Sequence, residues 1–178
     1  MDFDINSRID IFLGDITSVS CDAAVNAANS SLSGGGGVDG AIHKAAGRKL
    51  YEKCSEIIKK IGTLKPGEAV ITPAYEMKTA SNIIHTVGPF WKGGNFKERE
   101  VLSSCYENSL KIAADKKFDR VAFPAISTGV YFYPYKEAFD AAYETVSRFL
   151  KKNEFPKKVI FVFYEKSAFE YAKKKTGL

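Results

Sequence analysis

The sequence predicts a three-layer α/β/α sandwich whose central sheet is mainly parallel. Short apolar runs alternate with longer amphipathic patterns along the chain, which is typical of strands connected by helices. Several runs are apolar at nearly every position, as expected for strands that are covered by helices on both faces. Because no linker, repeat or low-complexity segment interrupts the pattern, we expect residues 1–178 to form one domain.

The predicted elements follow one another in a regular order. Strands are predicted at the short apolar runs, residues 9–13, 23–27, 69–72, 83–87, 121–126 and 159–164. Helices are predicted where apolar residues recur every three or four positions, at residues 39–61, 98–116, 134–152 and 168–175. Pro134 suits a first helical turn, and Asn95 with Glu98 and Ser167 with Glu170 have the spacing of capping boxes.

The most distinctive stretch is VNAANSSLSGGGGVDGAIHKAAG, at residues 25–47. It runs from an apolar strand through a polar turn into four consecutive glycines, and an amphipathic helix follows. The glycines allow backbone conformations that other residues avoid, and they let the chain approach a ligand closely. Because the N–H groups and the dipole of a helix N-terminus attract anions, this stretch predicts a loop that binds phosphate or diphosphate.

Two familiar phosphate-binding motifs do not fit this stretch. A P-loop closes its glycines with Lys and Ser or Thr, whereas Val38 and Asp39 follow here. Gly35, Gly37 and Gly40 match the dinucleotide fingerprint formally. That fingerprint expects an acidic residue at the end of a second strand about 20 residues later, where this chain is still helical. The pattern therefore indicates diphosphate binding without a redox fold.

The helix after the glycines carries two polar residues on its apolar face. That face is formed by Ile42, Ala46, Leu50, Cys54, Ile57 and Ile61. At the helical period, Asp39 and His43 project within the same stripe, so they need buried partners or must face a cleft. A capping aspartate with a core histidine is the structural explanation. The glycine loop at the same place favours a cleft.

Two further loops follow the carboxyl ends of predicted strands, where parallel α/β sheets bind their ligands. After residue 13, Asp15 either caps the next turn or accepts a hydrogen bond from a ligand amino group. After residue 126, a Ser-Thr-Gly turn forms a second backbone site for an anion. Aromatic residues crowd this second loop, and one of them could stack on a sugar or base: Tyr131, Phe132, Tyr133 and Tyr135.

Composition excludes several other classes of protein. The net charge of +5 raises the question of nucleic-acid binding, but the lysines are scattered in pairs and indicate no dedicated groove. Three cysteines and two histidines show no metal-ligand spacing, so we expect no metal and no cofactor. No apolar run has the length of a membrane span and the N-terminus does not resemble a signal peptide, so we expect a cytoplasmic protein without a membrane partner.

The motifs GDIT, VNAANSSLSGGGGVDGAIHKAAG, IHTVGP and FPAISTGVYFYP, in this order, resemble the macrodomain family and specifically its MacroD-type branch. The resemblance covers almost the whole chain. It implies a mixed-sheet α/β/α module that binds ADP-ribose. It also implies a metal-independent hydrolase that removes mono-ADP-ribose from acidic side chains of proteins and deacetylates O-acetyl-ADP-ribose. We expect such a protein to act as a monomer.

The resemblance implies binding roles for individual residues of this chain. Asp15 would accept the adenine amino group, the Ile16 N–H would lie at the adenine ring, and Tyr164 is a further adenine neighbour. Two loops would line the diphosphate and the distal ribose, with residues Gly35, Gly36, Gly37, Val38, Ser127, Thr128, Gly129, Val130 and Tyr131.

The resemblance also implies three catalytic residues. Asn29 would hold a hydroxyl of the distal ribose, and Asp39 would contact that ribose and orient or activate water. His43 would support Asp39, and we expect His85 to be structural. Cleavage of an acyl ester needs an oriented water and a stabilised oxyanion, so no Ser-His-Asp arrangement is required. Either Asp39 or a phosphate of the substrate could take the proton.

Two other functions remain as alternatives to the hydrolase. One is a non-catalytic ADP-ribose reader on the same fold, and the weaker one is nucleic-acid binding prompted by the basic charge. The presence of Asn29, Asp39 and His43 together favours the hydrolase. The chain departs from the branch at Phe132, where glycine is usual. We expect this ring to anchor its loop by packing inward. Turned toward the cleft, it would instead cover the distal ribose.

Overall fold

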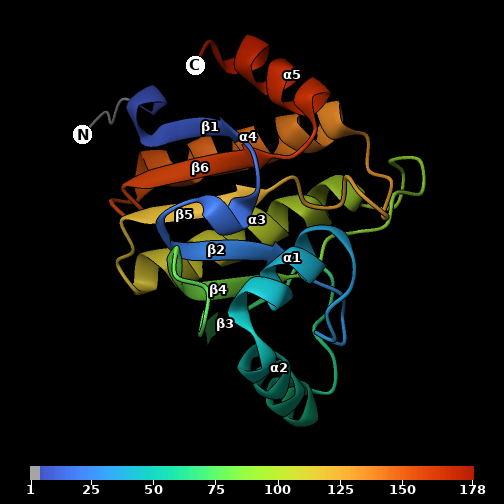
Figure 1. Cartoon of the computed structure of the whole chain (residues 1–178). Coiled ribbons are helices and arrows are strands. Elements are labelled where there is room, and N and C mark those ends of the chain that lie inside the picture. Colours follow the sequence, from blue (N-terminus) through green and yellow to red (C-terminus); the bar gives the residue numbers. More distant parts are fainter. Residues whose placement is uncertain (1–4) are drawn as a thin grey trace.

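The computed structural model describes residues 5–178 and contains one six-stranded sheet between helices (Figure 1). The strands are β1 (Ile9–Leu13), β2 (Cys21–Ala27), β3 (Ala69–Pro73), β4 (Ala80–Thr86), β5 (Arg120–Pro124) and β6 (Lys158–Phe163). Their order in the sheet is β1-β6-β5-β2-β4-β3. Only β3, which pairs with β4 at one edge, is antiparallel to its neighbour. The predicted α/β sandwich with a mixed, mainly parallel sheet is confirmed.

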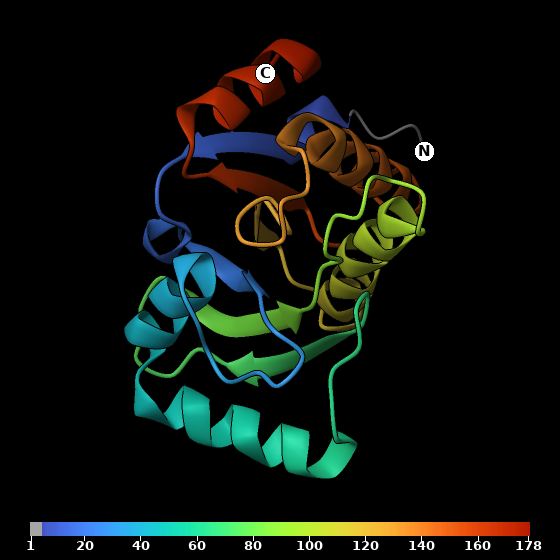
Figure 2. The same ribbon diagram turned by 90° about the vertical axis from the view of Figure 1, so that its right-hand side faces the viewer.

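Helices cover both faces of this sheet (Figure 2). They are α1 (Gly37–Ala46), α2 (Arg48–Ile61), α3 (Glu98–Asp115), α4 (Tyr135–Lys152) and α5 (Lys166–Thr176), with two short 3₁₀ turns, η1 (Asn6–Arg8) and η2 (Ile16–Ser18). One core lies between the sheet and α3, α4 and α5, and the other lies between the sheet and α1, α2 and η2. None of the helices within residues 5–178 is long and apolar enough to cross a membrane.

The central strands supply side chains to both cores in turn. In β6, Val159 and Phe161 pack toward α3 and α4, whereas Ile160 and Val162 pack toward α1 and α2. Successive side chains of a strand point to opposite faces, so a strand buried on both sides must be apolar at every position. This is why the central strands are the continuous apolar runs of the sequence.

The predicted helix at residues 39–61 is two helices, and the single-helix prediction was wrong. Gly47 ends α1 with a left-handed backbone (φ 79°), and its N–H donates to the carbonyl of His43 at 3.0 Å. A side chain at Gly47 would collide with the carboxylate of Glu76. The chain therefore turns at Gly47, and α2 moves away from the sheet far enough to leave Ile61 exposed.

The two predicted capping boxes were also wrong. The residue before α3 is Lys97, which has a left-handed backbone and makes no side-chain cap, and Asn95 lies in the preceding loop. Ser167 lies inside α5, which begins one residue earlier. At α3 the Glu98 carboxylate binds backbone N–H groups of the loop before the helix, so it does not form the predicted box with Asn95.

A buried arginine joins the start of the chain to the end of α4. The Arg8 guanidinium donates to the carbonyl oxygens of Leu150, Asn153, Glu154, Pro156 and Lys157. Arg8 is only 8% exposed. Carbonyls at a helix C-terminus have no partner within the helix, so a cation with five N–H donors satisfies several of them at once.

We expect Arg8→Ala to lower the free energy of unfolding by about 3 kcal/mol or more, because the buried carbonyls lose charge-assisted hydrogen bonds. Arg48→Ala is the matched control, since the Arg48 side chain is 91% exposed and forms only a surface ion pair with Glu52. Denaturant unfolding of both variants measures the difference. Equal midpoints for the two would contradict a structural role for Arg8.

Candidate active site

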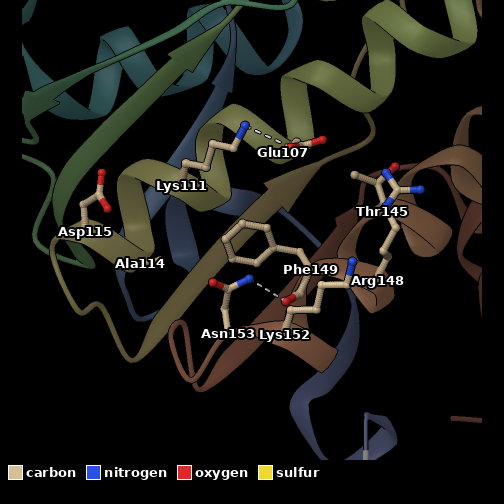
Figure 3. Close-up of a pocket in the computed structure, with 9 residues that line it drawn as sticks. All are labelled: Glu107, Lys111, Ala114, Asp115, Thr145, Arg148, Phe149, Lys152 and Asn153. Carbon is tan, nitrogen blue, oxygen red and sulfur yellow. Dashed lines mark hydrogen bonds and ion pairs between the residues drawn. The ribbon is translucent and has the colours of Figure 1, made fainter.

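One cavity in the described part of the chain is lined by none of the predicted site residues (Figure 3). It has a volume of about 300 Å³ and is lined by Glu107, Lys111, Ala114, Asp115, Thr145, Arg148, Phe149, Lys152 and Asn153. These residues precede β5 and β6, so the cavity lies near the amino ends of those strands. Its charges are mixed, and Lys111 pairs with Glu107 at 2.9 Å. Its charged side chains are exposed or half-buried, so the cavity lacks the buried acid or base that is typical of a catalytic site.

The predicted site residues lie at the opposite edge, where the parallel strands end. The loops after β1, β2, β5 and β6 all leave the sheet at this edge, because these strands run parallel. The Gly14 N–H donates to the Phe163 carbonyl at 2.8 Å, which brings the loop of Asp15 beside Tyr164. Tyr164 is exposed, whereas Ile16 is buried beneath its loop.

Asp15 caps the 3₁₀ turn that follows it. Its carboxylate accepts hydrogen bonds from the Thr17 N–H at 2.8 Å and from the Thr17 hydroxyl at 2.7 Å. The capping interpretation is therefore correct, and the side chain itself is exposed. A capping carboxylate can still accept a ligand donor, because its two oxygens offer about four lone-pair sites. The adenine role stays a prediction.

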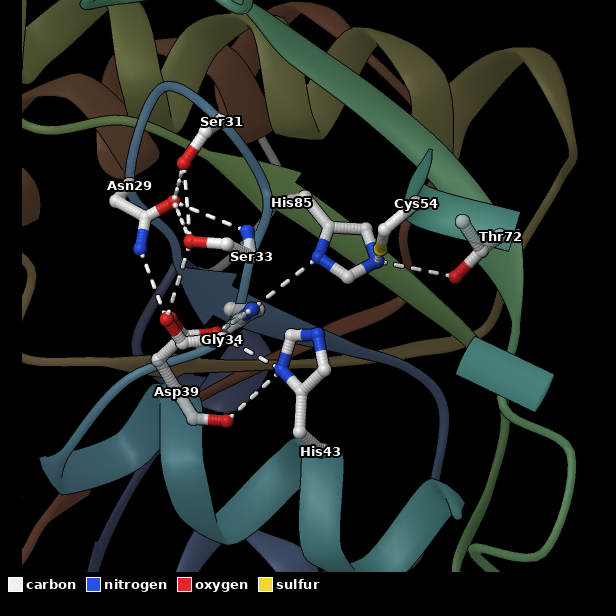
Figure 4. A network of polar contacts seen from close by, with 10 residues as sticks. Asn29, Ser31, Ser33, Gly34, Asp39, His43, Cys54, Thr72 and His85 are labelled. Atoms are coloured by element: carbon white, nitrogen blue, oxygen red, sulfur yellow. Dashed lines mark hydrogen bonds and ion pairs between the residues drawn. The ribbon is translucent and has the colours of Figure 1, made fainter. Parts of the chain in front are cut away.

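The glycine loop is held closed by Asn29 (Figure 4). The Asn29 amide donates to the Gly34 carbonyl at 2.9 Å. Its oxygen accepts from the Ser33 N–H at 3.1 Å and from the Ser31 hydroxyl at 3.0 Å. The loop then leads into α1, which begins at Gly37, two residues before the predicted start at residue 39. A side chain at Gly40 would collide with the Gly35 carbonyl, so only glycine allows this close packing of loop on helix.

Asp39 lies at the centre of a buried polar cluster (Figure 4). Its Oδ1 accepts from the Asn26 amide at 2.8 Å and from His43 Nδ1 at 3.0 Å. His43 Nδ1 also lies 3.0 Å from the Asp39 carbonyl, one helical turn earlier. Asp39 is 6% exposed and His43 is fully buried. Both therefore face inward, as the helical period predicted, and Asp39 Oδ2 has no hydrogen-bond partner among residues 5–178.

The cluster continues through the sheet to His85. Asn26 on β2 lies opposite His85 on β4, and its amide also contacts His85 Nδ1 at 3.1 Å. Because this amide is the donor, Nδ1 must be the acceptor, and the ring proton lies on Nε2. Nε2 then donates to the Thr72 hydroxyl at 3.0 Å. Asn26, Thr72 and His85 are all buried.

The two histidines of this cluster differ in charge, one being cationic and the other neutral. Burial disfavours the charged form of His43, but its hydrogen bonds to Asp39 outweigh burial and raise its pKa from 6.5 to about 10. Burial, with a smaller contribution from the charge of His43, lowers the pKa of His85 from 6.5 to about 3. His43 is thus the cation that pairs with Asp39, and His85 is a neutral hydrogen-bonding group.

The second loop lies between β5 and α4 and contains the other predicted binding residues. Ser127 is buried with a left-handed backbone (φ 68°), and its hydroxyl has no partner among the described residues. The Thr128 hydroxyl donates to the Ala125 carbonyl at 2.8 Å. Gly129 and Val130 are exposed at the tip of the loop. The Tyr131 ring stacks on Phe90, with ring centroids 3.7 Å apart.

Phe132 does not pack inward, so the expected anchoring role was wrong. Its side chain is 76% exposed, and its backbone is left-handed (φ 58°). The residue keeps the backbone conformation of a glycine, because the Phe132 N–H donates to the Gly129 carbonyl at 3.0 Å and closes the turn. An exposed ring leaves the covering role over the ligand as a prediction.

Comparison with known proteins identifies the fold family. The sequence pattern of the macro domain matches residues 25–142. An O-acetyl-ADP-ribose deacetylase of Salmonella typhimurium is 50% identical over 170 residues, which cover 95% of this chain and 94% of that protein. The chain belongs to the macro domain family.

Solved macro domains have the same architecture. A variant of the Oceanobacillus iheyensis macrodomain with ADPR superposes with a TM-score of 0.92 at 39% identity, covering 99% of this chain and 96% of that one. The Trypanosoma brucei macrodomain in complex with ADP-ribose gives a TM-score of 0.86 at 32% identity, covering 96% of this chain and 69% of that one. The family that the motifs predicted is therefore confirmed.

In this macro domain the structure joins Asp39 with His43 but keeps Asn29 apart from both. Asn29 bonds only within its own loop. The sequence analysis missed Asn26 and gave His85 a merely structural role. A polar residue inside an apolar strand was the available signal for Asn26. The contact with His85 spans 59 positions and depends on strand register, so nothing local indicated it. Residues 5–178 gather no set of three His, Cys, Asp or Glu side chains that could hold a metal ion.

We expect neither of the two histidines of this macro domain to titrate between about pH 5 and 8, although a free imidazole titrates near 6.5. The raised pKa of His43 contributes stability below pH 6.5 that is lost as the pH rises toward 10. The lowered pKa of His85 makes the fold lose stability as the pH falls from 6.5 toward 3. NMR titration of both rings, assigned with His43→Gln, measures this. A ring titrating near 6.5 would contradict it.

Proposed function

We propose that this chain is an ADP-ribosyl-ester hydrolase, which deacetylates O-acetyl-ADP-ribose and removes mono-ADP-ribose from acidic side chains of proteins. The observation that carries the proposal is its 50% identity, over 95% of its length, to a protein named O-acetyl-ADP-ribose deacetylase. The buried Asp39 beside the glycine loop is the second support, since its carboxylate is held by two donors and keeps one oxygen without a partner among the described residues.

In this proposal ADP-ribose lies along the carboxyl edge of the sheet. Adenine binds at Asp15 and Ile16 beside Tyr164, and the diphosphate lies between the glycine loop and residues 127–131. The first turn of α1 directs N–H groups and the positive end of its dipole at the phosphates. The unpaired Ser127 hydroxyl supports an anion at the second loop. Tyr131 and Asn29 then border the distal ribose.

The reaction that fits these residues is attack of water on the acyl carbon of the ester. The water oxygen forms the new bond to the acyl carbon, and the bond from that carbon to the ribose oxygen breaks. The water proton is taken by Asp39 or by a substrate phosphate and passes to the departing ribose oxygen, so the acyl group leaves as a carboxylic acid and ADP-ribose leaves with a free hydroxyl. Asn26 and His43 hold Asp39 Oδ1, so Oδ2 is the oxygen that can orient water. Neither route draws on a metal or a cofactor.

A non-catalytic ADP-ribose reader is the alternative, and it is supported by solved macro domains that were determined with ADPR or ADP-ribose. Incubation with a glutamate-ADP-ribosylated protein separates the two. The hydrolase releases free ADP-ribose, whereas the reader binds the modified protein and releases nothing. We further propose that the protein is cytoplasmic, because the buried Cys21, Cys54 and Cys105 are free thiols, as is typical of that compartment. A monomer remains our proposal for its oligomeric state.

We expect Asp15→Ala to weaken ADP-ribose binding by roughly 1.5–3 kcal/mol, the value of a charge-assisted hydrogen bond. Asp15→Asn is the matched variant, because it retains an oxygen that can cap Thr17 and loses only the charge. Calorimetric titration gives both affinities, and thermal unfolding shows whether the cap survives. Equal affinities for parent and Asp15→Ala would remove Asp15 from the adenine site.

We expect Asp39→Asn and Asn29→Ala each to lower turnover of the ester on the order of 10²–10⁴-fold, with a much smaller effect on ADP-ribose affinity. The asparagine keeps the shape of Asp39 and removes its charge. Asp119→Asn is the control, since this exposed carboxylate precedes β5 at the opposite end of the sheet. Single-turnover release of ADP-ribose, with and without a chelator, is the measurement. Full activity in the doubly substituted protein would place the chemistry elsewhere, and loss of activity with the chelator would show a metal requirement.

A further inference from the structure

We propose that Glu98 is a positioning residue for the distal-ribose end of the site. Its buried carboxylate shapes the loop between β4 and α3, and that loop holds Tyr131 in place. The effect on catalysis rests on the proposed function, whereas the effect on the loop does not.

The Glu98 carboxylate is surrounded by backbone donors of its own loop. Oε1 accepts from the Lys92 N–H at 2.9 Å and from the Gly94 N–H at 3.1 Å. Oε2 accepts from the Phe96 N–H at 2.6 Å. Glu98 is 2% exposed, and although burial alone would raise its pKa, the backbone donors hold that pKa below its usual value. The carboxylate is therefore charged, and its hydrogen bonds close residues 92–96 into a loop that we call the Glu98 ring.

Two successive glycines make the Glu98 ring possible. Gly93 and Gly94 have left-handed backbones, with φ of 99° and 87°, so two successive residues can curl around the carboxylate. All side chains at positions 92–97 are exposed, so this segment packs little apolar surface of its own. Its shape consequently depends on the hydrogen bonds to Glu98, because a loop without buried side chains has little else to offset its conformational entropy.

Phe90 and Trp91, which precede the Glu98 ring, are in contact with the loop between β5 and α4. The Trp91 N–H donates to the Tyr131 carbonyl at 2.8 Å. The Phe90 ring stacks on Tyr131 at 3.7 Å between centroids, and the Trp91 ring lies 4.6 Å from that of Tyr133. One backbone hydrogen bond and two ring contacts therefore join the two loops. A change in the conformation of the Glu98 ring therefore alters the position of Tyr131, through the contacts of Phe90 and Trp91.

The Gly94 backbone lies close to the Trp91 indole. A side chain added at Gly94 would lie 2.9 Å from the indole carbon Cη2 of Trp91. At Gly93, whose backbone is equally left-handed, an added side chain would meet no atom within 4 Å. Trp91 is the only tryptophan of the chain, so its fluorescence reports on this junction alone.

The first experiment compares Glu98→Gln with Glu100→Gln, which makes the same charge change at an exposed position of the same helical turn. We expect only Glu98→Gln to shift Trp91 emission to longer wavelength without ligand, because the amide nitrogen of Gln cannot accept from backbone N–H groups. We also expect it to weaken ADP-ribose binding by about tenfold, the equivalent of one lost hydrogen bond.

The second experiment keeps every charge and covers the case in which Glu98→Gln does not fold. Gly94→Ala and Gly93→Ala both place a side chain on a left-handed backbone, so both carry similar strain. Only Gly94→Ala forces Trp91 to move. We therefore expect it alone to change both Trp91 emission and ADP-ribose affinity, with far-ultraviolet circular dichroism confirming that both variants fold.

The outcomes separate this inference from the proposed function. Unchanged Trp91 emission in Glu98→Gln and Gly94→Ala would overturn the role of the ring, whatever the protein binds. Altered emission with parental ADP-ribose affinity would overturn the link to Tyr131. If the parent protein itself bound no ADP-ribose, the proposed function would fail, and the emission of the ligand-free variants would still decide whether Glu98 shapes the loop.

Discussion

The hydrogen bond of 2.8 Å between Asn26 and Asp39 is the contact on which the candidate site depends. Asn26 lies on the central strand β2, and Asp39 lies in the first turn of α1, so this bond fixes the helix start against the sheet. The intervening loop is then closed by Asn29, whose amide binds the Gly34 carbonyl. A buried carboxylate needs donors to offset the loss of water, and here those donors are the same groups that place α1.

The charges of the buried cluster are arranged so that each one is balanced. His43 is held as a cation by Asp39, and this pair is a net neutral unit inside the protein. His85 stays neutral because burial disfavours its charged form, and the neighbouring charge of His43 disfavours it further. As a neutral ring it both accepts from Asn26 and donates to Thr72. The cluster thus determines the orientation of Asp39 through hydrogen bonds from two sides.

Both loops of the candidate site are preformed by unusual backbone conformations. Leu32 in the glycine loop and Ser127 and Phe132 in the second loop are all left-handed, at a cost of about 1–2 kcal/mol each. Leu32 is buried, which returns about 1.5–3 kcal/mol, and Phe132 closes a turn by its N–H bond to Gly129. Such strain persists only where the surroundings hold it. A preformed loop loses little entropy on binding, which suits a site that must orient a ligand for reaction.

Local sequence patterns were enough to predict the layers, the bounds of β1, the loop before α1 and the inward direction of Asp39 and His43. Each of these follows from a local rule, either the two-residue period of strands, the 3.6-residue period of helices or the backbone freedom of glycine. The break at Gly47, the ring of backbone donors around Glu98 and the pairing of Asn26 with His85 became visible in the folded chain. The reason is physical: local periodicity reports which side of an element is buried. The partner that a buried polar group meets there depends on how strands distant in sequence align, and on the shape of the loops between them.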